Sequence, residues 1–174
     1  MKAPLIAVDV AYEEGVAFVA AVVFDDWRDA EARVERVLAI PEPAPYVPGE
    51  FYRRELPCIL RILDELAISR RAVVVDGFVW LDDGEAPGLG AHLWRALDER
   101  VAVVGVAKSP FRTTPPSAAL RRGHSDKLLY VTAAGIDLED AKQHIRQMHG
   151  EHRLPTLLRR VDQLARRVVT PEVR

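Results

Sequence analysis

The feature of this 174-residue sequence that most restricts its fold is a set of short apolar runs rich in β-branched residues. Their length and composition favour strands, and runs that are apolar throughout are typical of strands buried on both faces of a sheet. The expected strands are Leu5–Val10, Val16–Phe24, Ala72–Val75, Val101–Ala107 and Lys127–Thr132, while Arg33–Ile40 is either a third strand or a short helix.

Segments with helical periodicity follow and alternate with the later strands. Apolar residues at three- and four-residue spacing from Leu56 to Leu66 predict an amphipathic helix. Because strands come first as a meander and later alternate with helices, we expect an α/β fold in one domain over residues 1–174, with helices on both faces of a mixed sheet. The other expected helices are 91–97, 137–149 and 154–168, and the expected loops are 41–49, 82–90 and 110–123.

Composition excludes several classes of protein. Apolar residues make up 49% and charged residues 29%, an ordinary balance for a globular protein. The single cysteine, Cys58, cannot form an internal disulfide. No run is long and apolar enough to span a bilayer, and the N-terminus lacks a secretory cleavage site, so we expect a cytoplasmic protein without a membrane partner. The oligomeric state is not determined by the sequence, and a monomer is the default.

The net charge of -2 differs from that of a strongly basic nucleic-acid-binding domain. However, the negative charges of an acidic metal centre would cancel the positive charges of a basic rim around it. The net charge therefore does not exclude a nucleic acid as partner. The basic residues do cluster, and we expect about half of them to occupy only solvated helix faces and loop ends. The clusters are Arg53–Arg54, Arg112, Arg121–Arg122, Arg159–Arg160 and Arg166–Arg167.

Three acids stand in or beside apolar segments. Asp9 lies inside the first run, Asp76 follows Val75, and Glu55 begins the helix after the proline-rich loop. A carboxylate inside an apolar strand costs several kcal/mol unless it is paired, hydrogen-bonded or bound to metal. One such acid is most often an ordinary strand-end residue, but two on separate strands and a third on the next helix favour a shared cation. Hard ions such as Mg²⁺ take carboxylate oxygens, and sites of this kind hydrolyse phosphodiesters.

The same regions carry short motifs that follow one another in a fixed order. They are Ile6-Ala7-Val8-Asp9-Val10, Pro45-Tyr46-Val47-Pro48-Gly49, Arg54-Glu55, Val74-Val75-Asp76-Gly77, Gly105-Val106-Ala107-Lys108-Ser109 and His152-Arg153-Leu154-Pro155. In order and spacing the sequence resembles the endonuclease V family over most of its length. The resemblance implies a ribonuclease-H-like fold and a Mg²⁺-dependent nuclease, with Mn²⁺ as a substitute ion. It further implies a role in DNA repair, with deoxyinosine or inosine in DNA, or in RNA, as the target and cleavage at the second phosphodiester on its 3′ side.

The resemblance also assigns roles to individual positions. Asp9, Asp76 and Asp162 match the metal-binding aspartates, Glu55 matches a metal-associated glutamate, and Lys108 completes the catalytic set near the scissile phosphate. Tyr46 matches an aromatic wedge that separates strands beside the lesion. Taken alone, Tyr46 is also compatible with a loop anchor and Lys108 with a solvated strand end. For Asp162 the sequence alone favours a helix-surface charge, and only the family resemblance assigns it to the site. The expected substrate-binding residues are Tyr46, Pro48, Gly49, Arg54, Gly77, Lys108 and Ser109.

The sequence departs from the family pattern at three places. Asp82 stands where the family usually has a histidine, Ala133-Ala134-Gly135 replaces a Gly-His pair, and Asp9 comes without the helix that normally precedes it. We expect Asp82 to face solvent, because a polar turn follows it and a fifth acid would overload the site. These departures leave open a nucleic-acid-binding module of the same fold with weak or lost catalysis. An unrelated hydrolase or structural α/β domain would require the ordered motifs to be coincidental.

Overall fold

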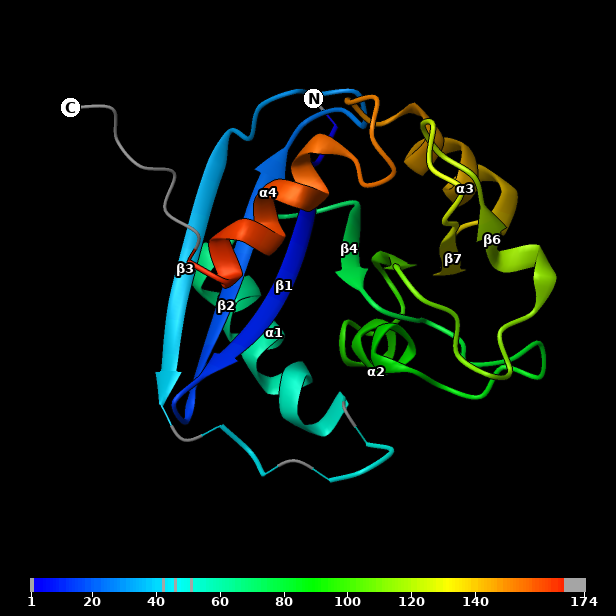
Figure 1. Ribbon diagram of the computed structural model, residues 1–174. Coiled ribbons are helices and arrows are strands. Elements are labelled where there is room, and N and C mark those ends of the chain that lie inside the picture. Colours follow the sequence, from blue (N-terminus) through cyan, green and yellow to red (C-terminus); the bar gives the residue numbers. More distant parts are fainter. Residues whose placement is uncertain (1, 42, 46, 51, 168–174) are drawn as a thin grey trace.

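The computed structural model describes residues 2–41, 43–45, 47–50 and 52–167 (Figure 1). Its strands are β1 (Leu5–Glu13), β2 (Val16–Phe24), β3 (Val34–Pro41), β4 (Ala72–Asp76), β5 (Ala102–Ala107), β6 (Ala119–Leu120) and β7 (Leu129–Ala134). Its helices are α1 (Tyr52–Leu66), α2 (Leu89–Ala96), α3 (Leu138–Gln147) and α4 (Thr156–Ala165), with a 3₁₀ turn η1 (Pro116–Ala118) before β6.

Within the described residues the strands form one mixed sheet in the order β3-β2-β1-β4-β5-β7-β6. The first three strands are an antiparallel meander, which settles the 33–40 segment as a strand. At the centre, β1 runs parallel to β4, with Leu5 opposite Ala72 and Val8 opposite Val75. The predicted mixed sheet is confirmed, and the two strands that carry Asp9 and Asp76 are neighbours in it.

Helices cover both faces of the sheet. Figure 1 shows α4 crossing in front of β1 and β2, with α1 behind them. Side chains alternate along each central strand, so one set packs with α3 and α4 and the other with α1 and α2. The first set includes Leu5, Ala7, Ala72 and Val74, and the second Ile6, Val8, Val73 and Val75. Asp9 and Asp76 continue the first alternation and therefore project toward α4.

Several boundaries differ from the sequence-based expectation. The first strand continues past Val10 to Glu13, and α1 begins at Tyr52 and not at Leu56. The strand expected over 127–132 begins at Leu129 and continues to Ala134. The segment 110–123, expected to be loop throughout, contains η1 and the short strand β6, which pairs with β7. Pairing across the sheet supplies hydrogen bonds that the proline-rich composition of this segment does not indicate. No helix in the described part of the chain is long and apolar enough to cross a membrane.

A buried arginine holds the connection between α3 and α4. The side chain of Arg122 is 5% exposed and donates to the carbonyl oxygens of Ile145, Met148, Gly150 and His152. These carbonyls lie at the C-terminal end of α3 and beyond it, where the helix itself provides no donors. Arg122 thereby fixes the segment from which α4 starts.

The segment after Asp76 lies directly on the neighbouring strands. The Gly77 N–H donates to the Val106 carbonyl at 3.1 Å, and the Val79 N–H donates to Thr132 Oγ1 at 2.8 Å. This close approach requires glycine at position 105, because a Cβ there would lie 2.5 Å from the Gly77 carbonyl oxygen. The glycine of the Gly105 motif therefore sets the position of the chain that leaves Asp76.

We expect Gly105→Ala to destabilise the protein by about 2–3 kcal/mol, since the added methyl overlaps backbone that cannot rotate away. Thermal unfolding followed by circular dichroism should show a melting temperature lower by roughly 5–10 °C. Gly84→Ala is the matched control, because a Cβ at Gly84 meets only the Asp82 side chain, at 3.5 Å. Equal losses in the two variants would contradict the close-approach argument.

Candidate metal centre

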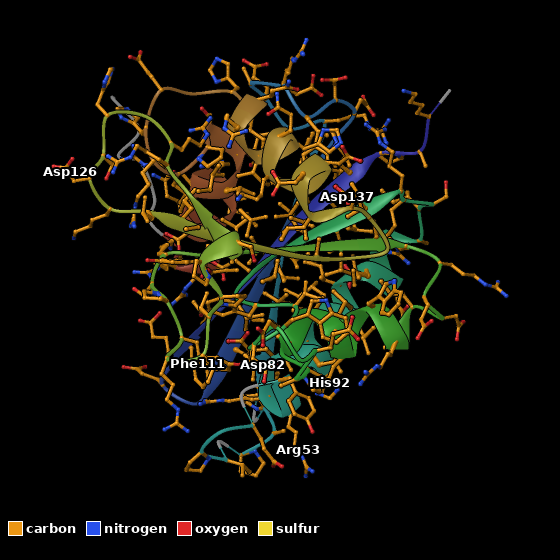
Figure 2. All side chains as sticks on the ribbon, turned by 90° about the vertical axis from the view of Figure 1, so that its right-hand side faces the viewer. Arg53, Asp82, His92, Phe111, Asp126 and Asp137 are labelled. Atoms are coloured by element: carbon orange, nitrogen blue, oxygen red, sulfur yellow. The ribbon has the colours of Figure 1, made fainter. Side chains whose placement is uncertain are left out.

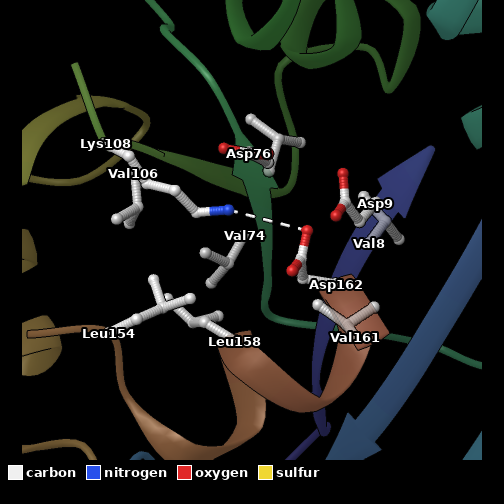
Figure 3. Close-up of a pocket in the computed structure, with 11 residues that line it drawn as sticks. Val8, Asp9, Val74, Asp76, Val106, Lys108, Leu154, Leu158, Val161 and Asp162 are labelled. Atoms are coloured by element: carbon white, nitrogen blue, oxygen red, sulfur yellow. Dashed lines mark ion pairs between the residues drawn. The ribbon is translucent and has the colours of Figure 1, made fainter. Parts of the chain in front are cut away.

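Three aspartates from three separate elements meet where β4 ends, beside the middle of β1. Asp9 comes from β1, Asp76 from the last position of β4, and Asp162 from α4, and each offers a carboxylate oxygen within 4.8 Å of the others. Figure 3 shows the three side chains directed toward one another. The parallel register of β1 and β4 brings the first two together, and packing of α4 on β1 and β2 brings the third.

Two cations flank this cluster, and both face the same oxygen. Arg166 Nε donates to Asp162 Oδ1 at 3.0 Å, and Lys108 Nζ lies 3.6 Å from that oxygen (Figure 3). Lys108 follows β5 and projects to the face that α4 covers. Arg153 ties the start of α4 to this strand end, because its guanidinium donates to the carbonyls of Lys108 and Leu128, each at 3.1 Å.

Repulsion and burial both act on the protonation of these acids. Burial raises the pKa of Asp9 to about 8, and the charges of Asp76 and Asp162 add to the shift, while the Val10 N–H opposes it. The pKa of Asp76 is also raised, mainly because its surroundings exclude part of the water, although its side chain is the most open of the three. Without a cation Asp9 therefore holds its proton near neutral pH.

Glu55 approaches the same place from the other face of the sheet. It lies in the first turn of α1, and burial together with the charge of Asp76 raises its pKa to about 7. It lines a separate hollow with Asp76 and is not in the group whose oxygens lie within 4.8 Å. The structure thus places Glu55 beside the three-aspartate cluster and Asp162 within it.

An open pocket of about 410 Å³ adjoins the cluster on the Glu55 side. Asp76 and Glu55 stand at one side of it, and the remaining walls are largely apolar or glycine. Those walls include Gly49, Tyr52, Gly77, Phe78, Leu81, Ser109 and Phe111. Tyr52 is stacked on His92 with ring centroids 3.6 Å apart, and Thr113 Oγ1 donates to the Leu81 carbonyl at 2.7 Å. These contacts hold the pocket walls in place.

The expected substrate-binding residues divide between this pocket and its surroundings. Gly49, Gly77 and Ser109 line the pocket. Pro48 and Gly49 occupy the centre of a turn that is closed by the Glu50 N–H and the Val47 carbonyl, with a φ of +79° at Gly49. Arg54 places its guanidinium 3.7 Å from the centre of the Tyr12 ring. Tyr46, the expected wedge, lies outside the described residues.

Asp82 is occupied within its own turn. Its Oδ1 accepts the Ala86 N–H at 2.9 Å, and the side chain is partly buried. Figure 2 shows Asp82 at the same end of the molecule as Phe111 and Arg53, away from Asp126 and Asp137. Among the described residues it is not part of the aspartate cluster. The expectation that Asp82 faces solvent did not include this hydrogen bond, which a short acid can make because the turn folds back over it.

The donor set fits a hard divalent cation. Three carboxylates supply oxygens alone, which suits Mg²⁺ or Mn²⁺ and not a thiolate-binding ion. Octahedral coordination at about 2.1 Å places ligand oxygens roughly 3–4 Å apart, so the observed cluster needs only a slight contraction to share one ion. The raised pKa of Asp9 agrees with a site that is completed by positive charge.

Sequence reasoning missed residues of two kinds. Phe111 has 42% of its surface exposed and lines the pocket. Its position in a proline-rich loop just after the Lys108 motif is the sequence feature that could have indicated a binding role. Arg166 contacts Asp162, but in the sequence it was one of several arginine pairs, and only the helical spacing of four from Asp162 distinguishes it.

Comparison with known proteins agrees with this geometry. Residues 2–135 match the family described as Endonuclease V. An endonuclease V of Streptomyces avermitilis is 30% identical over 183 aligned positions, covering 93% of this chain and 79% of the relative.

Two solved structures share the ribonuclease-H-like α/β fold. The endonuclease V of Bacillus subtilis superposes with a TM-score of 0.80 at 21% identity, covering 96% of this chain and 81% of that one. The endonuclease V of Ciona intestinalis, in complex with a 24mer DNA containing an inosine followed by a ribo-adenosine, has a TM-score of 0.78 at 16% identity and covers 95% and 85%. On the family match, the 30% identity and the shared fold, this chain belongs to the endonuclease V family of metal-dependent nucleases.

Proposed function

We propose that this protein is a Mg²⁺-dependent endonuclease that hydrolyses a phosphodiester 3′ to deoxyinosine, inosine or a damaged base, in DNA or alternatively in RNA. One observation carries the proposal: three aspartates converge beside a lysine and next to an open pocket. The complex of the Ciona relative with inosine-containing DNA supports the choice of substrate.

In this proposal Asp9, Asp76 and Asp162 hold the divalent ion. When bound, the ion activates water and stabilises the oxygen that leaves the phosphorus. Lys108 is a point charge at the edge of the cluster, suited to hold the oxygens of the phosphate undergoing attack. Glu55, with a pKa of about 7, can exchange a proton at its carboxylate near neutral pH on the side that faces the pocket.

The pocket of about 410 Å³ is proposed to receive the modified base outside the stack. Phe78, Leu81 and Phe111 offer apolar surface for the faces of a ring, and the glycines leave backbone groups open to its edge. Because Asp76 belongs to both the pocket and the metal cluster, a base held there lies next to the site of cleavage.

One observation favours a second function, that of a nucleic-acid-binding protein with weak or lost catalysis. Asp82 stands where the family usually has a histidine and is engaged with Ala86 in its own turn. A protein that lacks this group could bind nucleic acid and cut it slowly. The following experiments separate the two functions.

Asp76→Asn should lower cleavage about 100-fold or more, because it removes a charged ligand without changing shape. Cleavage is measured on labelled single- and double-stranded oligonucleotides containing inosine, uracil or a mismatch, with Mg²⁺ or Mn²⁺. Binding measured in Ca²⁺ should stay the same or improve, since a negative charge is removed. Asp83→Asn, an exposed acid of the neighbouring turn, is the control and should cut normally. If the Asp76→Asn variant still cleaves, the catalytic role proposed for Asp76 is wrong.

Asp9→Asn should raise the stability of the metal-free protein at pH 8. The folded pKa of Asp9, about 8, lies above its ordinary value of 3.8, so the folded state holds the proton more tightly. Its stabilising effect is complete below pH 4 and is lost as pH rises to 8. The variant lacks this loss, and we expect its melting temperature in EDTA to be higher by about 2–8 °C at pH 8. Mg²⁺ should reverse the ranking, because only the wild type gains full metal binding. Parallel pH profiles of the two proteins in EDTA would contradict this account.

Asp82→His should raise Mg²⁺-dependent cleavage about tenfold, because a histidine near the attacking water or the leaving group can position it or exchange a proton. The loss of the Ala86 hydrogen bond should cost only about 1 kcal/mol of stability. Asp82→Asn, which keeps an acceptor oxygen, is the control and should not gain activity. No gain in a protein that already cuts efficiently would show that another residue fills the role of the histidine.

A further inference from the structure

Asp162 Oδ1 is shared by two side chains that both carry positive charge. Arg166 reaches it from one side at 3.0 Å and Lys108 from another at 3.6 Å. A divalent cation bound by the three aspartates needs an oxygen of Asp162 as well. Arg166 and Lys108 therefore contact an oxygen that the divalent cation would also bind.

Arg166 borders a hollow distinct from the pocket beside Glu55. This hollow, of about 290 Å³, opens along the cluster on the side of β1, and its lining is largely polar. Its walls are Asp9, Val10, Ala11, Tyr12, Asp76, Asp162 and Arg166. Lys108 lies in a different hollow, with Leu154 and Leu158 (Figure 3). The cluster thus has one cation on each of two sides.

We propose that Arg166 binds a backbone phosphate of the nucleic acid in the hollow on the β1 side, once a divalent cation has replaced it at Asp162. The inference rests on the proposed function and adds to it a second phosphate-binding residue besides Lys108. The ligand is a phosphodiester group, which a guanidinium can grip with two parallel hydrogen bonds.

Charge balance supports this exchange. With all three aspartates ionised, three negative charges face the two positive charges of Lys108 and Arg166. A divalent cation turns that excess of one negative charge into an excess of one positive charge. A single phosphodiester carries one negative charge and restores neutrality. The metal-bound cluster therefore carries the positive charge that attracts the backbone.

The pair between Arg166 and Asp162 is also easy to break. The side chain of Arg166 is 64% exposed, and the two residues are one helical turn apart. Exposed pairs of this spacing are weak because water and salt screen them. A cation bound directly to the carboxylates competes successfully with such a contact, and the freed arginine remains tethered next to the cluster by the end of α4.

The test compares Arg166→Gln with Arg160→Gln. Arg160 lies on the same helix and loses the same charge, but it pairs with Glu35 of β3. Manganese affinity is measured by calorimetry without nucleic acid, and binding of a single-stranded inosine oligonucleotide is measured by fluorescence anisotropy in Ca²⁺ at several KCl concentrations. We expect Arg166→Gln to bind Mn²⁺ about three- to tenfold more tightly, because a neighbouring positive charge is gone. It should bind the oligonucleotide about five- to tenfold more weakly, with a salt slope smaller by roughly one.

Arg166→Lys should retain most of the oligonucleotide affinity, because it keeps the charge, and Arg160→Gln should match the wild type in both assays. The proposal is overturned if Arg166→Gln binds the oligonucleotide as Arg160→Gln does, or if it binds Mn²⁺ more weakly than the wild type. A wild-type protein that binds neither Mn²⁺ nor the oligonucleotide would overturn the proposed function, and this inference with it. The two failures are thus distinguishable.

Discussion

Mutual repulsion among three carboxylates held within 4.8 Å of one another is the constraint on which the rest of the structure depends. Such a cluster opposes folding unless rigid elements impose it. Here two parallel strands at the centre of the sheet fix Asp9 and Asp76, and a helix packed across β1 and β2 fixes Asp162. Two kinds of contact stabilise the fold against this repulsion. They are the apolar contacts beneath α4 and the hydrogen bonds of Arg122 and Arg153, which connect the start of α4 to α3 and β5.

The site is divided between the two faces of the sheet. The aspartates lie on the face covered by α4, whereas Glu55 and the adjoining pocket come from the face of α1 and α2. They meet where β4 ends, because the chain beyond Asp76 passes over β5 and β7 so closely that only glycine fits at position 105. Asp76 is the residue common to both halves and links the pocket to the aspartate cluster.

Much of the fold followed from strand length and composition, since short apolar runs have few alternatives to a buried sheet. Placing Asp9 and Asp76 together was also possible, because neighbouring parallel strands bring their ends to one edge. Asp162 was beyond such reasoning: one acid on an amphipathic helix is indistinguishable from a surface charge until the packing of α4 is known. The pocket walls were equally hidden, because Phe78, Leu81 and Phe111 come together only through the turns of two loops.

The placement of Asp162 on α4 has a consequence for the order in which the protein becomes active. A chain leaves the ribosome N-terminus first, so β1 and β4, with Asp9 and Asp76, emerge long before α4. The hollow that α4 lines is then still open, and the third aspartate of the cluster has not yet been made. A partly made chain can therefore assemble most of its sheet while remaining unable to gather the full set of acids. The order of synthesis therefore delays assembly of the three-aspartate cluster until the last described helix has packed.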